Sequence, residues 1–423
     1  TIDFSKRQTT MKRFVLSILS IAATLSSTVC HAEDRNLREN RNKKKDHLKE
    51  SLRIVAFGTS HTFGASLEDR YSYAYPWRLS SAATNLALRA NGPSYPAVCT
   101  ESMVGDDAIY DVIILEYHLR AQEGLFILAE RLRERFPDAL IIFFKIWHPF
   151  YIMRADTSQN FVTWAKEFAG EKTSLHSKEM KDIMLRSKEN DWLYVPLPQC
   201  DEAVEEAAKA VGGYVYQLQQ NPSPRKAILY HNHWFAEDFH HLSIFGHQLV
   251  AEDLAKIINK KARRSDRLGT WSGGDSCKSW FTDGDVGVPF DKSLQVVEFG
   301  SGKFSLEIPI TGGSFEVVNP FSNDRTLYLT FMVMGPAPSL YPKTRVVVVD
   351  SMNQNLGLDV DLDPTSYIHE GHRVHVAKLS KIGVVPPGTI TVRLFPLEDT
   401  ERPFRLTGFS LTNDIESDFE IHR

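Results

Sequence analysis

The sequence predicts an α/β domain built on a parallel sheet, followed by an antiparallel β-sandwich. From residue 52 to about residue 261, apolar strand-like runs alternate with amphipathic helical segments, which is typical of a three-layer α/β/α domain. After Arg264 the chain changes to short runs rich in β-branched residues, separated by turn signals such as Gly273-Gly274 and Pro386-Pro387-Gly388. Many short strands with turns between them favour a β-sandwich. A length of 423 residues also favours two domains.

Hydrophobic periodicity assigns the elements of the first domain. Leu125–Phe136 has the pattern of an amphipathic helix, and Pro137 follows its end. Ile141–Phe144 is continuously apolar, as expected for a strand covered on both faces. The predicted strands are Leu52–Gly58, Ala97–Met103, Asp111–Tyr117, Ala139–Trp147 and Trp192–Pro196. The predicted helices are Tyr75–Ala90, Leu125–Phe136, Phe161–Phe168, His176–Glu189, Asp201–Val211 and Ile244–Lys260.

The second domain is predicted to consist of strands alone. The boundary lies near residues 262–272, which gives domains at 52–264 and 270–423. The predicted strands are Gln295–Phe299, Phe304–Ile308, Ser314–Val318, Leu327–Met334, Arg345–Asp350, Arg373–Ala377, Thr389–Phe395 and Arg405–Leu411.

The N-terminal region reads as a targeting segment. Residues 1–10 precede Met11 and are interpreted as non-native upstream sequence. Residues 11–32 fit a signal peptide, because a basic start and an apolar run lead to Cys30-His31-Ala32, which has small residues where cleavage needs them. Residues 33–51 form a charged linker. We therefore expect a secreted or secretory-pathway protein, with a membrane anchor as the minority alternative because the linker is rich in Lys and Arg.

Composition excludes several classes of function. The net charge of −4 gives no nucleic-acid signal, so no nucleic-acid partner is expected. Once the signal peptide is removed, Cys99, Cys200 and Cys277 allow at most one internal disulfide, and the sequence leaves its pairing open. No spacing resembles a zinc site, and neither a metal nor a cofactor is expected.

Ser60 is the first residue with catalytic potential. It follows an apolar strand within Gly58-Thr59-Ser60, at the edge of the sheet where ligands of such folds bind. Backbone N–H groups of the following turn would point at an oxyanion there. A serine in this position can equally be a simple helix N-cap, so this turn alone is weak evidence.

Asp238 and His241 supply the other two parts of a hydroxyl-nucleophile site. Residues three apart on one turn face the same side, so the carboxylate could hold the imidazole as a general base. The alternative is a capping aspartate with a surface histidine. His240 and His247 compete with His241; we interpret His240 as pointing away, and His247 as helix surface or as lying behind the site.

Together the two segments resemble the GDSL/SGNH hydrolase superfamily. Gly58-Thr59-Ser60-His61-Thr62-Phe63-Gly64 matches the family's first block, with Thr59 in place of its usual Asp, and Asp238-Phe239-His240-His241 matches its last. The resemblance covers about residues 52–260. It implies a flavodoxin-like sheet, a Ser60 nucleophile, a His241 base and an orienting Asp238.

The resemblance extends less well to the oxyanion hole and the substrate pocket. It implies that the N–H groups of Ser60 and Gly105 hold the oxyanion. Arg120 stands where the family has an Asn donor, so it would either strengthen the oxyanion hole or block it. His118, which takes the place of a family glycine, is predicted to contact substrate, as are Trp147 and Trp234.

These observations predict a serine-dependent ester hydrolase acting on a small-molecule or glycan ester, with deacylation of carbohydrate favoured. The first alternative is a catalytically impaired member of the fold that binds a glycan or a protein. An acyltransferase that uses the same serine is the second alternative.

Overall fold

The computed structural model describes most of the chain beyond the N-terminal region. The described residues are 52–121, 124–146, 152–157, 159, 161, 163, 164, 167, 177–188, 191–194, 198–218, 232–238, 240–271, 274–281, 290–299, 302–334, 340–364, 375–400 and 402–413. The predicted signal peptide and charged linker lie outside them. Residues from Ser51 to Arg423 form one compact unit.

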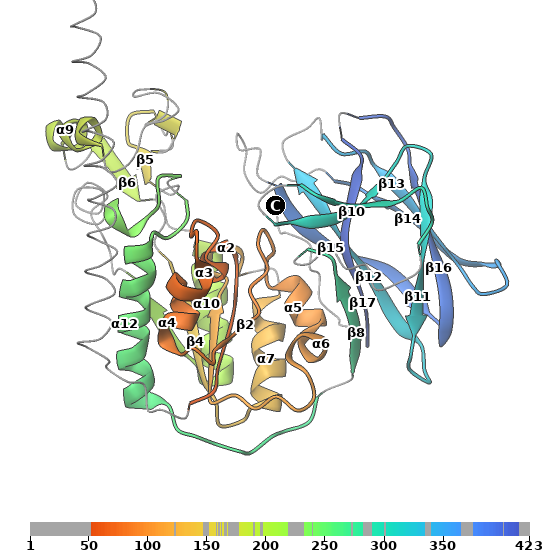
Figure 1. The fold of residues 1–423 in the computed structure, drawn as a ribbon, viewed down its shortest axis with the longest axis horizontal. Coiled ribbons are helices and arrows are strands. Elements are labelled where there is room, and N and C mark those ends of the chain that lie inside the picture. Colours follow the sequence, from red (N-terminus) through yellow and green to blue (C-terminus); the bar gives the residue numbers. More distant parts are fainter. Residues whose placement is uncertain are drawn as a thin grey trace, which may run out of the picture. The chain divides into compact units, whose positions relative to one another are not determined.

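A five-stranded parallel sheet forms the centre of the first half of this unit (Figure 1). Its strand order is β2-β1-β3-β4-β7, the doubly wound order in which the chain first adds a strand on one side of β1 and then on the other. The strands are β1 (Ile54–Gly58), β2 (Thr84–Asn85), β3 (Val112–Glu116), β4 (Leu140–Lys145) and β7 (Tyr214–Gln217).

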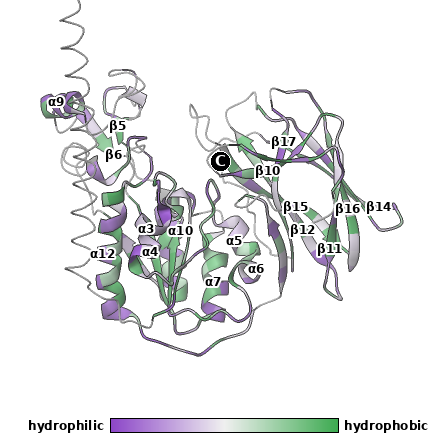
Figure 2. Ribbon diagram, viewed as in Figure 1, coloured by the Kyte–Doolittle hydropathy of each residue, from purple (hydrophilic) through white to green (hydrophobic). Residues whose placement is uncertain are grey.

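Helices cover both faces of this sheet. On one face, α12 (Ile244–Lys261) packs against α4 (Tyr75–Leu79), and on the other α7 (Leu125–Arg135) packs against α10 (Pro198–Val211). Figure 2 shows hydrophobic and hydrophilic residues alternating along α7 and α12, as expected for helices with one buried stripe. The shorter helices are α2 (Ser60–Phe63), α3 (Arg70–Tyr73), α5 (Ser94–Val98), α6 (Thr100–Val104) and α9 (Lys178–Arg186).

Two predicted elements are wrong. Ala97–Met103 is not a strand but lies in the helices α5 and α6. The predicted helix Tyr75–Ala90 ends at Leu79, and the second strand of the sheet is the short β2 beyond it. Trp192–Tyr194 is a strand (β6), but it pairs with β5 (Ile152–Arg154) in a separate antiparallel ribbon.

The second half of the unit contains two antiparallel sheets. One has the order β15-β12-β17-β10-β9, with β8 also paired to β17, and the other has the order β11-β16-β13-β14. Inward residues of both sheets, such as Leu329, Phe409 and Val392, form a single hydrophobic core, as in a β-sandwich. The strands are β8 (Asp275–Ser279), β9 (Gln295–Glu298), β10 (Phe304–Ile308), β11 (Gly313–Asn319), β12 (Arg325–Met334), β13 (Thr344–Val349), β14 (Asn355–Leu362), β15 (His375–Val385), β16 (Gly388–Pro396) and β17 (Phe404–Thr412).

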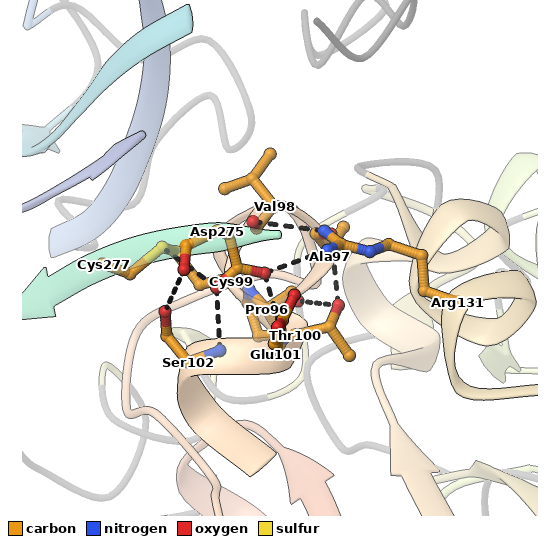
Figure 3. A network of polar contacts seen from close by, with 10 residues as sticks. All are labelled: Pro96, Ala97, Val98, Cys99, Thr100, Glu101, Ser102, Arg131, Asp275 and Cys277. Carbon is orange, nitrogen blue, oxygen red and sulfur yellow. Dashed lines mark hydrogen bonds and ion pairs between the residues drawn. A yellow bond between two sulfur atoms is a disulfide. The ribbon is translucent and has the colours of Figure 1, made fainter. Parts of the chain in front are cut away.

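A disulfide and a buried ion pair join strand β8 to the α/β half (Figure 3). The disulfide links Cys99 to Cys277, while Cys200 is free and buried. Asp275 accepts from Arg131 Nη2 at 2.9 Å and from the N–H of Ser102 at 2.8 Å, so it caps helix α6. The residue that stabilises α6 therefore comes from far along the chain, which explains why local periodicity misassigned this segment.

Candidate active site

The carboxyl ends of β1 and β3 define the expected place for chemistry in this sheet. The strand order reverses between these two neighbouring strands, and open α/β sheets bind ligands in the crevice outside such a switch point. Ser60 follows β1, and Glu116 ends β3. The sequence-predicted nucleophile is therefore located at the switch point.

Ser60 begins the single-turn helix α2. Thr59 caps this turn, and Gly64 ends it with a φ of +81°, a left-handed conformation that favours glycine. The turn packs directly on β1: a Cβ added at Gly58 would lie 2.2 Å from Thr62 Oγ1. Glycine is therefore required at position 58 for the Ser60 turn to approach the sheet.

Glu116 anchors the Ser60 turn from below, a role that the sequence analysis missed. Its Oε2 accepts hydrogen bonds from Thr59 N (3.0 Å), Thr59 Oγ1 (2.9 Å) and Thr62 Oγ1 (3.0 Å). The side chain is fully buried. Burial raises the pKa of Glu116 from 4.5 to about 7, although the hydrogen bonds from Thr59 and Thr62 oppose the shift. The sequence signal for this role is Glu116 itself, a charged residue at the end of an otherwise apolar strand.

Asp238 and His241 are paired as the sequence predicts. His241 Nδ1 lies 2.5 Å from Asp238 Oδ2, and the N–H groups of His240 and His241 both donate to Asp238 Oδ1 at 2.9 Å. Burial tends to raise the pKa of Asp238, but the bonds and the charge of His241 outweigh it and hold that pKa well below its usual range. The carboxylate is therefore ionised and fixes the imidazole with Nε2 directed away from it.

The Ser60 turn and the Asp238–His241 segment lie side by side. The ring of His61, the residue after Ser60, has its centroid 5.7 Å from that of His241. Ser66 Oγ donates to Leu242 O at 2.7 Å, which ties the loop after α2 to the residue after His241. Two segments about 180 positions apart in the sequence are thus brought to one edge of the sheet.

The prediction for His240 is wrong, whereas His247 follows the second of its two predicted readings and lies behind the site. His240 does not point away, because its ring centroid is 4.5 Å from that of His241 and 5.3 Å from that of His61. His247 is not on the helix surface but is fully buried, and its Nδ1 accepts from Tyr75 N at 3.3 Å. Burial, together with the charges of Arg78 and His241, lowers the pKa of His247 to about 3, so this histidine is neutral.

His118, predicted to contact substrate, is buried and bonded to protein groups instead. Its Nδ1 lies 3.2 Å from Ile146 O and its Nε2 lies 3.0 Å from Asp201 Oδ1, so both ring nitrogens have protein partners. Asp201 also pairs with Lys145. The bond from His118 lowers the pKa of Asp201 to about 2, with further lowering by Lys145. His118 therefore joins the ends of β3 and β4 to α10.

The predicted oxyanion donor Gly105 has its N–H committed elsewhere, and Arg120 contacts a neighbouring loop. Gly105 follows helix α6, and its N–H donates to Glu101 O at 2.8 Å, so it closes that helix and does not serve an oxyanion. Arg120 donates from Nη1 to Ala90 O at 3.3 Å. This contact places Arg120 against the loop that follows β2, whose Leu88 N–H in turn bonds Gly58 O at 3.0 Å.

Of the two predicted aromatic contacts, Trp147 lies outside the described residues. Trp234 is 7% exposed, and its carbonyl accepts from Ser243 N at 2.8 Å at the start of α12. Helix α12 approaches so closely that a Cβ at Gly246 would lie 2.1 Å from this carbonyl. Trp234 is therefore packed under α12 and does not form an exposed wall.

The described part of the chain carries neither a metal-binding cluster nor a membrane-spanning helix. Within it, no group of three or more His, Cys, Asp or Glu side chains is arranged to hold a metal ion. Among the helices described, none combines the length and apolarity needed to cross a membrane.

Comparison with known proteins gives remote structural likenesses only. No protein-family model matches the chain, and no curated protein matches it either. Among solved structures, a two-domain esterase active on acetylated mannans is 13% identical over 88% of this chain and 95% of its own, with a TM-score of 0.45. A protein from Slackia heliotrinireducens assigned to the SGNH hydrolases is 16% identical over 49% of this chain and 98% of its own, with a TM-score of 0.29. These scores are too low to carry a functional argument.

Proposed function

We propose that this chain is a serine-dependent ester hydrolase of the SGNH type, acting on acyl groups carried by carbohydrate. Ser60 Oγ attacks the ester carbonyl while His241 Nε2 takes its proton. His241 then returns that proton to the departing alcohol, and a water molecule activated by His241 releases the acyl group as a carboxylic acid. Asp238 holds His241 in the required orientation throughout.

One observation carries this proposal: the bonded Asp238–His241 pair lies beside the turn that Ser60 begins. The His61–His241 ring contact and the bond from Ser66 to Leu242 hold the two segments together. Nucleophile, base and orienting carboxylate in one place are what acyl transfer requires.

The oxyanion hole is reassigned in this proposal, since Gly105 is committed elsewhere. Ser60 N–H remains the first donor, because it lies at the start of the turn. The loop 86–91 after β2 supplies the second from an N–H other than that of Leu88, which bonds Gly58 O and so holds the loop beside the Ser60 turn. The contact of Arg120 with Ala90 O supports this placement. Removing one such donor typically costs about 3–4 kcal/mol of transition-state stabilisation.

A secreted location is part of the proposal. The Cys99–Cys277 disulfide supports it, because disulfides persist in oxidising compartments and are rare in reducing ones.

Covalent labelling tests the proposed nucleophile directly. The full-length protein is treated with a fluorophosphonate probe, and the labelled peptide is identified by mass spectrometry. We expect labelling at Ser60, loss of label and of p-nitrophenyl acetate hydrolysis in Ser60→Ala, and retention of both in Ser293→Ala, an exposed serine of the β-sandwich. If a folded Ser60→Ala protein hydrolyses the ester as well as the wild type, the mechanism is wrong. A folded wild-type protein that is neither labelled nor active supports the catalytically impaired alternative.

A further inference from the structure

An open cavity of about 430 Å³ lies beside the Ser60 turn. Phe63, one helical turn after Ser60, forms part of its wall, so the cavity begins next to the proposed nucleophile. Cys277 and Ser279 of β8 line another part, which the disulfide fixes in place. Volumes of this size are typical of sites that bind small ligands.

Two aromatic rings form a platform in this cavity. Tyr71 is 64% exposed, so its ring is open to a ligand from solvent. Its ring centroid lies 4.8 Å from that of Trp77, with 53° between the ring planes. Both rings line the cavity. Large, rigid aromatic faces that also carry a polar group suit ligands such as sugars, which present both C–H and hydroxyl groups.

A guanidinium group lies on the same platform. Arg70 Cζ lies 4.0 Å from the ring centroid of Phe63 and 4.8 Å from that of Tyr71, and Arg70 Nη2 donates to Tyr71 Oη at 2.8 Å. Within the described chain, Arg70 forms no ion pair with a carboxylate. The neighbouring Asp69 is occupied as the cap of α3, where it accepts from Ser72 N at 3.0 Å. The guanidinium is thus positioned by aromatic stacking, with donors left for an external anion.

Further positive charge lies behind Arg70. Arg89 Cζ is 5.3 Å from the same Phe63 ring, which places the two charges within about one Debye length (~10 Å) of each other. Burial lowers the pKa of Arg89, and the charge of Arg70 lowers it further. Two guanidinium groups against one phenylalanine ring, one of them lining the cavity, give this region a positive field that favours a bound anion.

We propose that this cavity is a subsite for a negatively charged sugar unit, a uronate or a sulfated sugar, adjoining the unit that Ser60 deacylates. The sugar ring stacks on Tyr71 and Trp77, and its carboxylate or sulfate binds Arg70 in the positive field to which Arg89 also contributes. The role of the subsite in turnover rests on the proposed hydrolase function, whereas binding to it does not.

Isothermal titration calorimetry on the full-length protein tests this subsite without requiring catalysis. Tetramers of galacturonic acid, sulfated galactose and mannose are compared at low and at moderate salt. We expect a charged tetramer to bind at least tenfold more tightly than the mannose tetramer, with an advantage that shrinks as salt rises. Which charged tetramer binds identifies the anion.

Variants locate the binding. Arg70→Gln should weaken binding of the charged tetramer by about tenfold to a hundredfold, because hydrogen bonds to charged groups are the stronger class. Arg70→Lys should restore part of the loss, and Tyr71→Ala, an exposed position with little cost to folding, should weaken all tetramers that bind. The matched control is Arg267→Gln, which removes an exposed arginine beside Asp138, at the amino edge of the sheet, and should leave binding unchanged.

Each outcome decides the proposal. Equal affinity for charged and neutral tetramers, binding that survives both Arg70→Gln and Tyr71→Ala, or no binding of any tetramer would overturn it. Fluorophosphonate labelling of Ser60 in the same preparation reports on the hydrolase proposal alone. A labelled protein without tetramer binding refutes only the subsite, and Arg70-dependent binding in an unlabelled protein refutes only the hydrolase.

Discussion

Strand β3 carries a fully buried carboxylate at each end, and the two are stabilised in different ways. Asp111 precedes the strand, at the amino edge of the sheet, and Glu116 ends it at the carboxyl edge. Asp111 accepts from the Arg53 guanidinium at 2.8 and 3.0 Å, and from the N–H of Ser265 at 2.9 Å. Burial alone would raise the pKa of Asp111, but Arg53 outweighs it, and the pKa is lowered.

Glu116 has no cation in contact with it among the described residues. Its donors are the hydroxyls of Thr59 and Thr62 and one backbone N–H, and its Oε1 lacks a partner in the described part of the chain. This difference shows at which edge of the sheet a buried carboxylate lowers stability. The amino edge holds a satisfied ion pair, whereas the carboxyl edge keeps a costly carboxylate directly under the proposed nucleophile. Such sites are candidates for function.

The largest effect on stability is expected from breaking the buried ion pair between Asp111 and Arg53. Asp111→Asn leaves the Arg53 guanidinium without its buried counterion, and we expect the free energy of unfolding to fall by about 3 kcal/mol. The kcat and KM of the remaining folded protein should not change, because Asp111 lies at the opposite edge of the sheet from Ser60. Urea denaturation and ester hydrolysis on the same samples measure both. A variant of full stability, or one that folds normally but loses kcat, contradicts this assignment.

A pH dependence of stability is expected from Glu116, at the carboxyl end of β3. Because folding raises the pKa of Glu116 from 4.5 to about 7, the folded state binds more protons between those values, and this contribution to stability falls as the pH rises from 4.5 to 7. The loss amounts to about 3 kcal/mol and levels off above pH 7. Glu116→Gln cannot ionise and should lack this decline, so it gains on the wild type as the pH rises.

Urea denaturation of both proteins from pH 5 to pH 8 gives the comparison. The difference in unfolding free energy between the two proteins is informative, since other titrating groups cancel in it. If the unfolding free energies of the two proteins changed in parallel across that range, ionisation of Glu116 would not destabilise the folded state as predicted.

The sequence predicts the strands and the Asp238–His241 pair, but not the long-range contacts of the buried carboxylates. β1, β3 and β4 were identified because a strand covered on both faces is a continuous apolar run, and the Asp238–His241 pair because its three-residue spacing is local. The functions of Glu116 and Asp275 depend on partners from distant segments, Thr59 in one case and helix α6 in the other. Local pattern contains no information on such contacts.

The differences between predicted and observed surroundings of the site residues have the same origin. The resemblance places Gly105 in the oxyanion hole only if Ala97–Met103 is a strand, whereas helix α6 uses the Gly105 N–H for its own closure. His118 and Trp234 carry side chains common in binding sites, but both are buried by the packing of helices α10 and α12. Residue type alone does not distinguish these roles.

A smaller effect is expected from the hydroxyl that links Glu116 to the Ser60 turn. Thr62 is fully buried, donates to Glu116 Oε2 and contacts Tyr75 Oη at 2.8 Å. Thr62→Val keeps the shape and removes both bonds, so the unfolding free energy should fall by about 1–2 kcal/mol. The kcat should also fall, because the turn that carries Ser60 is held less firmly.

Thr100→Val is the matched control for this prediction. Thr100 is equally buried, and its hydroxyl donates to Pro96 O at 2.7 Å, so its bond joins α6 to α5 and does not involve the Ser60 turn. We expect a similar loss of stability with kcat unchanged. If both variants lose stability and neither loses kcat, the Thr62–Glu116 bond is structural only.

The smallest effect should come from the exposed partner of Arg53. Arg53 Nη1 also lies 2.8 Å from Asp266, whose side chain is 72% exposed, so the same guanidinium bonds a buried and an exposed carboxylate at equal distance. Water screens the exposed pair, and Asp266→Asn should change the unfolding free energy by no more than about 0.5 kcal/mol. A loss comparable with that of Asp111→Asn in the same urea titration would mean that contact with arginine, and not burial, decides the stability of the amino edge. The difference between Asp111 and Glu116 would then depend only on the lack of a cation beside Glu116.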